Sequence, residues 1–416
     1  MCVVALGLAT ASCDDYLDIN TDPNAPSGDV VTSGMIMPAV EMNLATCYGN
    51  FMRITGGYYA QHYAQSFGTS NYVDFSSFYM SATRSSSNYT QMMLRVIGNA
   101  NIIKEKSSAV GEWGTYLAAS TLRVFAYEAL IDCYGEMPYS EAFTSNTAPK
   151  FDNGKDVYAG LVSELNEALE KVTPSDFVCT NFLYPGKSAD LWIKFANSLK
   201  LRLLTRGGDK MNAQAELDAL VKEGDFIASD VQWAGCWGPE SGAESPFYAE
   251  EFASNFGSTQ VNVIANVALL GTMNQGSYTD PRTAAFWLPG SNKKFNGYIS
   301  SNTQIIQGTV DAEGTTCDAA YFSRPVASYK MPVVILSLSD VEFYLSEYYA
   351  KKNDAANAMK MTKNRILGSQ CVASQLKMSA VTASPPMNLV RRMITAIGSV
   401  YRRTMNRPYI AARNLP

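Results

Sequence analysis

The sequence STLRVFAYEALIDCYGEMPYSEAF at residues 120–143 decides how this chain folds. Its apolar side chains recur at steps of three and four, which places them on one stripe of a helix: Leu122, Phe125, Ala126, Ala129, Leu130 and Cys133. Gly135 follows where a helix can end in a left-handed residue, and Pro138 prevents the helix from resuming. The pattern predicts an amphipathic helix that ends near Gly135, with Cys133 in the core.

Two later segments repeat this pattern. One, at residues 149–172, starts with the turn signal Asp152-Asn153-Gly154, and the other lies at residues 186–206. In the second, Ser188 is expected to cap a helix whose first turn contains Asp190. Amphipathic helices joined by short connections bury their apolar faces only against one another, so the three predict a helical-hairpin array. The simplest role for their apolar residues is core packing.

The order of these segments resembles the SusD/RagB family of outer-membrane nutrient-binding lipoproteins, and within it the second SusD-like branch. The runs that carry the resemblance are CDDYLDINTDPNAPS (13–27), LIDCYGEMPYSEAF (130–143), DVYAGLVSELNEAL (156–169), WIKFANSLKLRLLTR (192–206) and MPVVILSLSDVEFYLSEYYAKK (331–352). The resemblance implies a mostly α fold, built as a tetratricopeptide-like helical scaffold with a loop-rich irregular insertion. It also implies a nutrient ligand, most simply a glycan, and a SusC-like TonB-dependent transporter as partner.

The sequence divides into regions of different character. The expected regions are a signal peptide (1–12), a lipidated N-terminal arm (13–33), a helical scaffold (34–228), a loop-rich ligand-facing region (229–330), a returning helix (331–354) and a basic tail (355–416). Helical periodicity fades after residue 229, where Gly and Asn become frequent, and loops on a rigid scaffold commonly carry binding sites. Ser339 and Glu342 form an expected capping box where the helix returns.

The first twelve residues, MCVVALGLATAS, form an apolar run that is too short to span a bilayer and ends in small residues before Cys13. This resembles a bacterial lipobox, so Cys13 is the expected lipid anchor and the expected location is the outer membrane, facing the cell exterior. No Lys or Arg precedes Arg53, so the positive segment of a signal peptide is missing. A start codon assigned too far downstream explains this gap, and a cytoplasmic chain with a stray cysteine is the alternative.

Composition and motifs exclude several functions. The net charge of −5 argues against nucleic acid as a partner, because phosphates require a basic face. The sequence contains no P-loop, no G-x-S-x-G, no H-E-x-x-H and no G-x-G-x-x-G, and we expect neither a cofactor nor a metal. His62 is the only histidine, which favours a structural role over a zinc site or a catalytic triad.

Two alternative functions remain open. The run WAGCWGPESGAESPFYAEEF combines aromatic residues with Glu240, Glu244, Glu250 and Glu251, and two carboxylates beside a sugar suffice for glycoside hydrolysis. Carboxylates are too common for this to be specific, so a binding protein that is not an enzyme is the favoured interpretation. The other alternative is a helical-array adaptor without a small-molecule ligand.

Five aromatic residues are the candidate ligand-binding residues, because flat rings stack on the apolar faces of sugars. Trp233, Trp237 and Trp287 lie in the loop-rich region and come first; Tyr72 and Tyr79 come second. For each of them, packing of the loops onto the helices is an equally plausible role, because buried Trp is common. If the rings bind ligand, replacing Trp233 and Trp237 by Ala will weaken binding and leave the scaffold folded.

Residues 355–416 contain ten Lys or Arg and no Asp or Glu, although the whole chain has 38 acidic residues. The family resemblance also fades after Asp354. A basic tail for an acidic surface is one interpretation of this segment. The favoured one is a frame-shifted or otherwise aberrant terminus that begins near residue 355.

Overall fold

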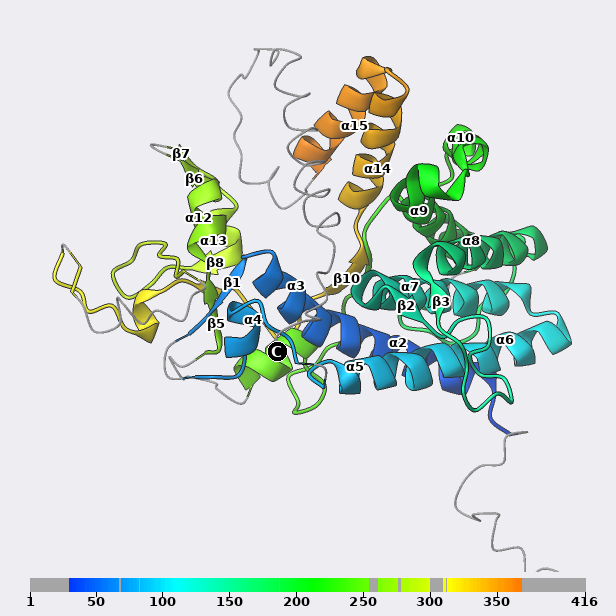
Figure 1. Ribbon diagram of the computed structural model, residues 1–416, viewed down its shortest axis with the longest axis horizontal. Helices are drawn as coiled ribbons and strands as arrows, with labels where there is room; N and C mark the ends of the chain where they lie inside the picture. Colours follow the sequence, from blue (N-terminus) through cyan, green and yellow to red (C-terminus); the bar gives the residue numbers. More distant parts are fainter. Residues whose placement is uncertain are drawn as a thin grey trace, which may run out of the picture.

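The computed structural model describes residues 30–66, 69–81, 83–186, 188–253, 261–275, 278–299, 310–311 and 313–368. Over these residues the chain is mostly α-helical, which confirms the predicted fold class. Figure 1 shows the long helices gathered on one side and the short elements of the loop-rich part on the other. Two of these long helices, α14 (Leu338–Lys351) and α15 (Ala355–Gly368), lie toward the top of this view.

The long helices are α2 (Ser33–Thr46), α6 (Asn99–Val110), α7 (Trp113–Tyr134), α8 (Gly154–Lys171), α9 (Asp190–Gly207), α10 (Gln214–Glu223), α14 (Leu338–Lys351) and α15 (Ala355–Gly368). The shorter ones are η1 (Cys47–Met52), α3 (Arg53–Tyr59), α4 (Val73–Ser76), α5 (Ser86–Gln91), η2 (Met92–Gly98), η3 (Gly208–Met211), α11 (Pro246–Tyr248), η4 (Ala249–Ala253), α12 (Val267–Met273), α13 (Thr283–Phe286) and η5 (Ala319–Tyr321). Of these, η1, η2 and η4 are π-helical.

The strands are short and pair in antiparallel twos. They are β1 (Tyr63–Gln65) with β5 (Val263–Ala265), β2 (Glu136–Met137) with β3 (Asp152–Asn153), β4 (Val231–Trp233) with β10 (Val333–Leu336), β6 (Asn274–Gln275) with β7 (Tyr278–Thr279), and β8 (Trp287–Leu288) with β9 (Arg324–Pro325). The pairing of β2 with β3 brings the end of α7 next to the start of α8, which makes the two helices a hairpin.

Helix α7 is central to the scaffold and is buried along most of its length. It ends as predicted: Gly135 has a φ of 81° and its N–H donates to the carbonyl of Ile131 at 2.8 Å. The expectation for Cys133 is wrong, because this residue is exposed in the last turn of α7. The stripe of buried residues stops before it, at Ile131.

A side chain caps the start of α8, but none caps the start of α9. Asn153 caps α8, since its side-chain oxygen accepts a hydrogen bond from the Asp156 N–H at 3.1 Å. The expected cap of α9 by Ser188 is wrong, because Ala189 precedes that helix and no side chain caps it. Ser188 instead forms an isolated β-bridge with Phe177.

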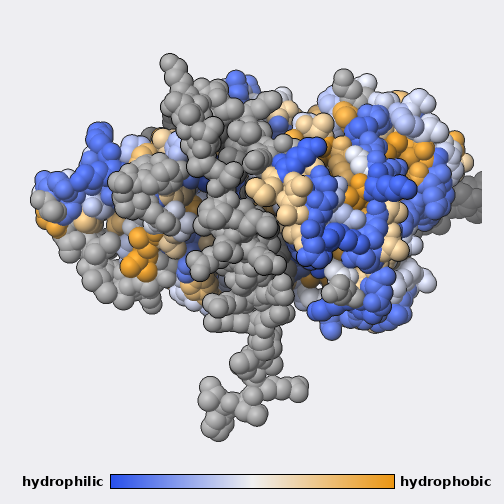
Figure 2. All heavy atoms as spheres, turned by 90° about the horizontal axis from the view of Figure 1, so that it is seen from above, coloured by the Kyte–Doolittle hydropathy of each residue, from blue (hydrophilic) through white to orange (hydrophobic). Residues whose placement is uncertain are grey.

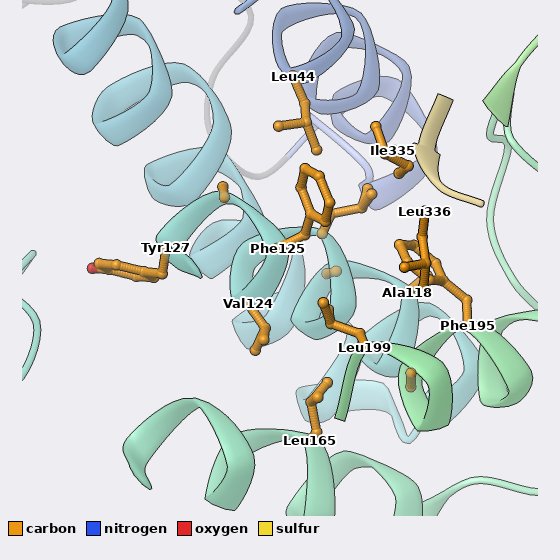
Figure 3. Close-up of a cluster of buried hydrophobic side chains, with 14 of the residues drawn as sticks. Leu44, Ala118, Val124, Phe125, Tyr127, Leu165, Phe195, Leu199, Ile335 and Leu336 are labelled. Carbon is orange, nitrogen blue, oxygen red and sulfur yellow. The ribbon is translucent and has the colours of Figure 1, made fainter. Parts of the chain in front are cut away.

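The main core lies where α2, α7, α8, α9 and β10 meet. Figure 3 shows side chains from these elements converging on one cluster. Its fully buried members include Leu44, Phe125, Leu165, Phe195 and Leu336. Seen from above, the outside of the helical half carries hydrophilic side chains with apolar ones between them (Figure 2). This is the surface expected of amphipathic helices packed on their apolar faces.

A buried ion pair crosses this core. The Nε of Arg202 in α9 donates to both carboxylate oxygens of Glu128 in α7 at 2.9 Å. The same guanidinium donates from Nη1 to the carbonyl of Ile335 in β10 at 3.4 Å. One side chain therefore connects two helices and the strand that returns from the loop-rich part.

The C-terminal helices correct the expected position of one capping box. Ser337 and Asp340 form the capping box of α14, two residues before the expected pair Ser339 and Glu342. Beyond residue 355 the chain continues as α15, packed on α14, where the Ser346 hydroxyl donates to the Ala358 carbonyl at 3.0 Å. The interpretation of residues 355–416 as an aberrant terminus stays a prediction, and residues 369–416 lie outside the described part.

Glu41 makes the stability of the fold depend on pH. This residue of α2 is fully buried and accepts hydrogen bonds from the N–H groups of Phe182 and Leu183 at 2.5 and 3.0 Å. Burial raises the pKa of its carboxyl from 4.5 to about 7, although the two backbone hydrogen bonds act in the opposite direction. The folded state therefore holds the proton more tightly than the unfolded state does.

We expect the contribution of Glu41 to the free energy of unfolding to decrease as the pH rises from 4.5 to 7. Compared with Glu41→Gln, the wild type should lose about 3 kcal/mol over this window. Urea titrations of both proteins at several pH values measure the difference. The control is Glu167→Gln, because Lys171 lowers the pKa of Glu167, whose contribution therefore changes only below pH 4.5 and stays constant over this window. A constant difference between wild type and Glu41→Gln would contradict the expectation.

Candidate functional site

Trp233, a first-choice ligand-binding candidate, lies in the main core. It is fully buried, and its position in β4 pairs with Val333 of β10. Trp237 is half-buried against the same core, and its indole Nε1 donates to the Trp233 carbonyl at 3.0 Å. Trp233 therefore has no ring face for a ligand, while Trp237 retains an exposed part.

Trp287 and Tyr72 lie in a second, smaller core of the loop-rich part. Trp287 is buried with its ring edge toward Tyr63, at a centroid distance of 6.2 Å. Tyr72 is buried and stacks on Phe75, and its hydroxyl donates to Glu251 Oε1 at 2.6 Å. For Trp233, Trp287 and Tyr72 the structure therefore corrects the expectation of an exposed stacking face, because their rings pack inside the protein.

Tyr79 differs from these, because its side chain is exposed at the surface. We call Tyr59, Val73, Phe78 and Tyr79 the aromatic patch; their exposed fractions are 39%, 40%, 48% and 64%. The rings of Tyr59 and Phe78 meet edge to face with centroids 5.9 Å apart. Large apolar side chains that gather on a surface next to polar groups are typical of a binding site.

The backbone holds the patch in place. The N–H of Tyr79 donates to the Asp74 carbonyl at 2.9 Å, and the N–H of Phe78 donates to the Phe75 carbonyl at 3.0 Å. Phe78 has a φ of 56°, a conformation that a bulky residue adopts only where its surroundings impose it. This turn directs Phe78 outward while Phe75, three residues earlier, is buried beneath.

Arg84 stabilises the same turn through two contacts. Its Nε lies 3.1 Å from Asp74 Oδ2, and its guanidinium lies over the Phe75 ring at 4.9 Å from the centroid. Both contacts fix α4, the helix that precedes Phe78 and Tyr79. The aromatic patch is thus largely preformed, which reduces the entropy lost when a ligand binds.

The four carboxylates that suggested hydrolysis differ in their exposure. Glu251 is fully buried beside Tyr72, whereas Glu240 and Glu250 are exposed and Glu244 is half-buried. Glu244 accepts a hydrogen bond from the Gly242 N–H at 2.7 Å. His62 is exposed in the turn after α3, and the described residues contain no cluster of side chains that could hold a metal ion.

A pocket of about 370 Å³ lies beside the patch, between the helical run η1–α3 and β10. Tyr48, Met52, Arg53 and Gly56 line one wall, and Pro332 and Val334 belong to the other. Its volume is at the small end of ligand pockets.

Reasoning from the sequence missed Tyr59, Phe78 and Arg53. Phe78 and Tyr59 lie in stretches rich in aromatic residues, which is a signal for the region and not for the individual residue. Arg53 is the first basic residue of the chain, but nothing local shows that it meets β10 some 280 residues later. The fold brings Tyr59 and Phe78 into contact and places Arg53 opposite β10 across the pocket.

Comparison with known proteins identifies the class. The family model described as starch-binding, associating with outer membrane (SusD-like, second branch) matches residues 23–369, so the chain belongs to the SusD-like family. This confirms the resemblance seen in the sequence and extends it through α15. The family is one of outer-membrane-associated binding proteins. None of the curated proteins matches the chain.

Solved structures show the same fold. A chitin-binding protein is 17% identical with a TM-score of 0.64, covering 83% of this chain and 78% of its own. A SusD homologue from Bacteroides uniformis is 20% identical with a TM-score of 0.60, covering 82% and 73%. Another, from Parabacteroides distasonis, is 16% identical with a TM-score of 0.63, covering 81% and 74%. These likenesses establish the tetratricopeptide-like helical scaffold.

Of the helices in the described part of the chain, none combines the length and the apolar character that crossing a bilayer requires. The expected lipid anchor, Cys13, lies outside the described residues. The five cysteines that are described, Cys47, Cys133, Cys179, Cys236 and Cys317, are all free thiols.

Proposed function

We propose that this protein binds a glycan through the aromatic patch and delivers it to a SusC-like TonB-dependent transporter in the outer membrane. The observation that carries the proposal is the preformed surface of Tyr59, Phe78 and Tyr79. Aromatic rings bind the apolar faces of sugars while nearby polar groups bind the hydroxyls. Starch and chitin binding in the family and in a structural neighbour supports a glycan as the ligand class.

The same arrangement supports binding without catalysis. Hydrolysis needs two carboxylates on opposite sides of the scissile bond, about 5 to 10 Å apart. Glu251, the residue whose burial raises its pKa as a general acid requires, is fully buried and bonded to Tyr72. Turnover of an oligosaccharide by the purified protein would favour the hydrolase instead.

Delivery to a transporter requires that the protein stay near it. Acylation of Cys13 would anchor the chain in the outer membrane, and the arm to residue 33 would let the body reach a transporter beside it. Holding a captured glycan next to the pore raises its effective concentration there. Failure to bind any glycan would instead favour the helical-array adaptor.

We expect the double replacement Phe78→Ala/Tyr79→Ala to weaken glycan binding, because it removes two exposed rings of the patch. The loss should be about 1–3 kcal/mol for each stacking contact, by analogy with bases stacked on aromatic side chains. Calorimetric titration with maltohexaose and chitohexaose measures it. Phe177→Ala is the matched control, because Phe177 is an equally exposed ring in the helical half. Equal affinities of the double variant and the control would reject the patch as the binding surface.

A further inference from the structure

Arg53 is the only charged residue among those that line the pocket between η1–α3 and β10. Its three contacts are all with neutral groups. The guanidinium carbon lies 4.2 Å above the Phe247 ring, Nη1 lies 3.2 Å from the sulfur of Met331, and Nε lies 3.5 Å from the Tyr63 hydroxyl. Within the described ranges Arg53 forms no ion pair, unlike Arg84, Arg123 and Arg202.

A half-buried cation without a carboxylate partner is costly, since burial removes hydration that nothing in the protein replaces. Aromatic and sulfur contacts fix the orientation of the guanidinium but leave its positive charge unneutralised. The exposed carboxylate of Glu250 accepts a hydrogen bond from Asn50 at 3.4 Å and forms no ion pair with Arg53 among the described residues. The pocket is therefore complementary to an anion, and the planar fork of Arg binds a carboxylate through two parallel hydrogen bonds.

One wall of the pocket is formed by a π-helical segment. Tyr48, Gly49 and Met52 belong to the π-helical segment η1, and such segments occur frequently at functional sites. Gly49 lets β10 approach closely: a Cβ there would lie only 2.8 Å from Val333 Cγ2. Gly56, by contrast, is open, because a Cβ there would meet nothing within 4 Å.

The pocket also lies next to the aromatic patch along α3. Gly56 lines the pocket and Tyr59 belongs to the patch, and residues three apart share a face of a helix. The two positions are separated by about one turn, roughly 5 Å. A glycan chain stacked on the patch can therefore extend into the pocket.

We infer that Arg53 and its pocket form a subsite for an acidic sugar, whose carboxylate pairs with the guanidinium while its ring packs between Met52 and Val334. This inference rests on the proposed glycan-binding function and specifies its substrate class: uronic-acid-containing glycans. The neutral part of the chain stacks on Tyr59, Phe78 and Tyr79.

Calorimetric titration with trigalacturonate and with the neutral chitohexaose tests the inference. We expect Arg53→Gln to weaken trigalacturonate binding at least tenfold and to leave chitohexaose binding unchanged. Gly56→Leu should act in the same way by filling the pocket, without touching the contacts of Arg53. Lys330→Gln, which removes an exposed charge close to the pocket, is the control and should change little.

Each other outcome contradicts the inference in a distinguishable way. If wild type and both pocket variants bind trigalacturonate with equal affinity, and chitohexaose binding still depends on the aromatic patch, the acidic subsite alone is overturned. Absence of binding of either glycan to the wild type overturns the proposed function together with it. A carrageenan tetrasaccharide carries sulfate groups and no uronic acid. If the protein binds it in place of trigalacturonate, and this binding depends on Arg53, the subsite is not specific for carboxylates.

Discussion

Replacing Glu128 with Gln should lower the free energy of unfolding by about 3–5 kcal/mol, the usual cost of breaking a buried ion pair from one side. Burial alone would lower the pKa of Arg202, but the Glu128 carboxylate outweighs it and raises that pKa, so the guanidinium stays charged. Without its partner, the charge would remain buried among α7, α9 and β10.

Urea denaturation followed by circular dichroism measures this loss. Lys171→Met removes one partner of the exposed Glu167–Lys171 pair on α8 and should change stability by less than about 1 kcal/mol. The double variant Glu128→Leu/Arg202→Met removes both charges and should recover much of the stability. If Glu128→Gln proves as mild as Lys171→Met, the pair does not hold the scaffold together.

Replacing Trp233 with Ala should cost about 3–5 kcal/mol of stability, because it leaves a large cavity in the main core. This reverses the expectation from the sequence, in which Trp233 and Trp237 could be replaced together with the scaffold intact. The reason is position: Trp233 is fully buried and lies in the strand that pairs with β10.

Thermal unfolding of Trp233→Ala and of Tyr79→Ala compares the stability lost by removing a core ring with that lost by removing a surface ring. Tyr79→Ala should change stability by no more than about 0.5 kcal/mol, since surface substitutions away from special features are mild. A Trp233→Ala protein as stable as Tyr79→Ala would show that the ring is not a core residue.

The scaffold could be predicted from the sequence because its signals are local. The apolar spacing of α7 and the glycine after it, Gly135, predicted both the helix and its end. The sequence did not predict the exact start of α14, because several residues that can cap a helix lie close together there. Around Ser337 and Ser339 the sequence offers two plausible capping boxes, and the packing of β10 against β4 selects the first.

The site was less predictable, because burial of an aromatic side chain depends on distant partners. Tyr72 and Tyr79 lie seven residues apart in similar surroundings. Tyr72 is buried in the second core, where its hydroxyl donates a hydrogen bond to Glu251, 179 residues later. Trp233 is buried because β10 pairs with β4 about a hundred residues later in the chain. No local pattern carries this information.

A crystal structure of the protein soaked with maltohexaose or chitohexaose tests the central claim most directly, because it shows where a glycan binds. Our account predicts a sugar ring against Phe78 or Tyr79, with the chain running along α3 toward Gly56. A glycan bound on a face that contains none of the aromatic patch would contradict it.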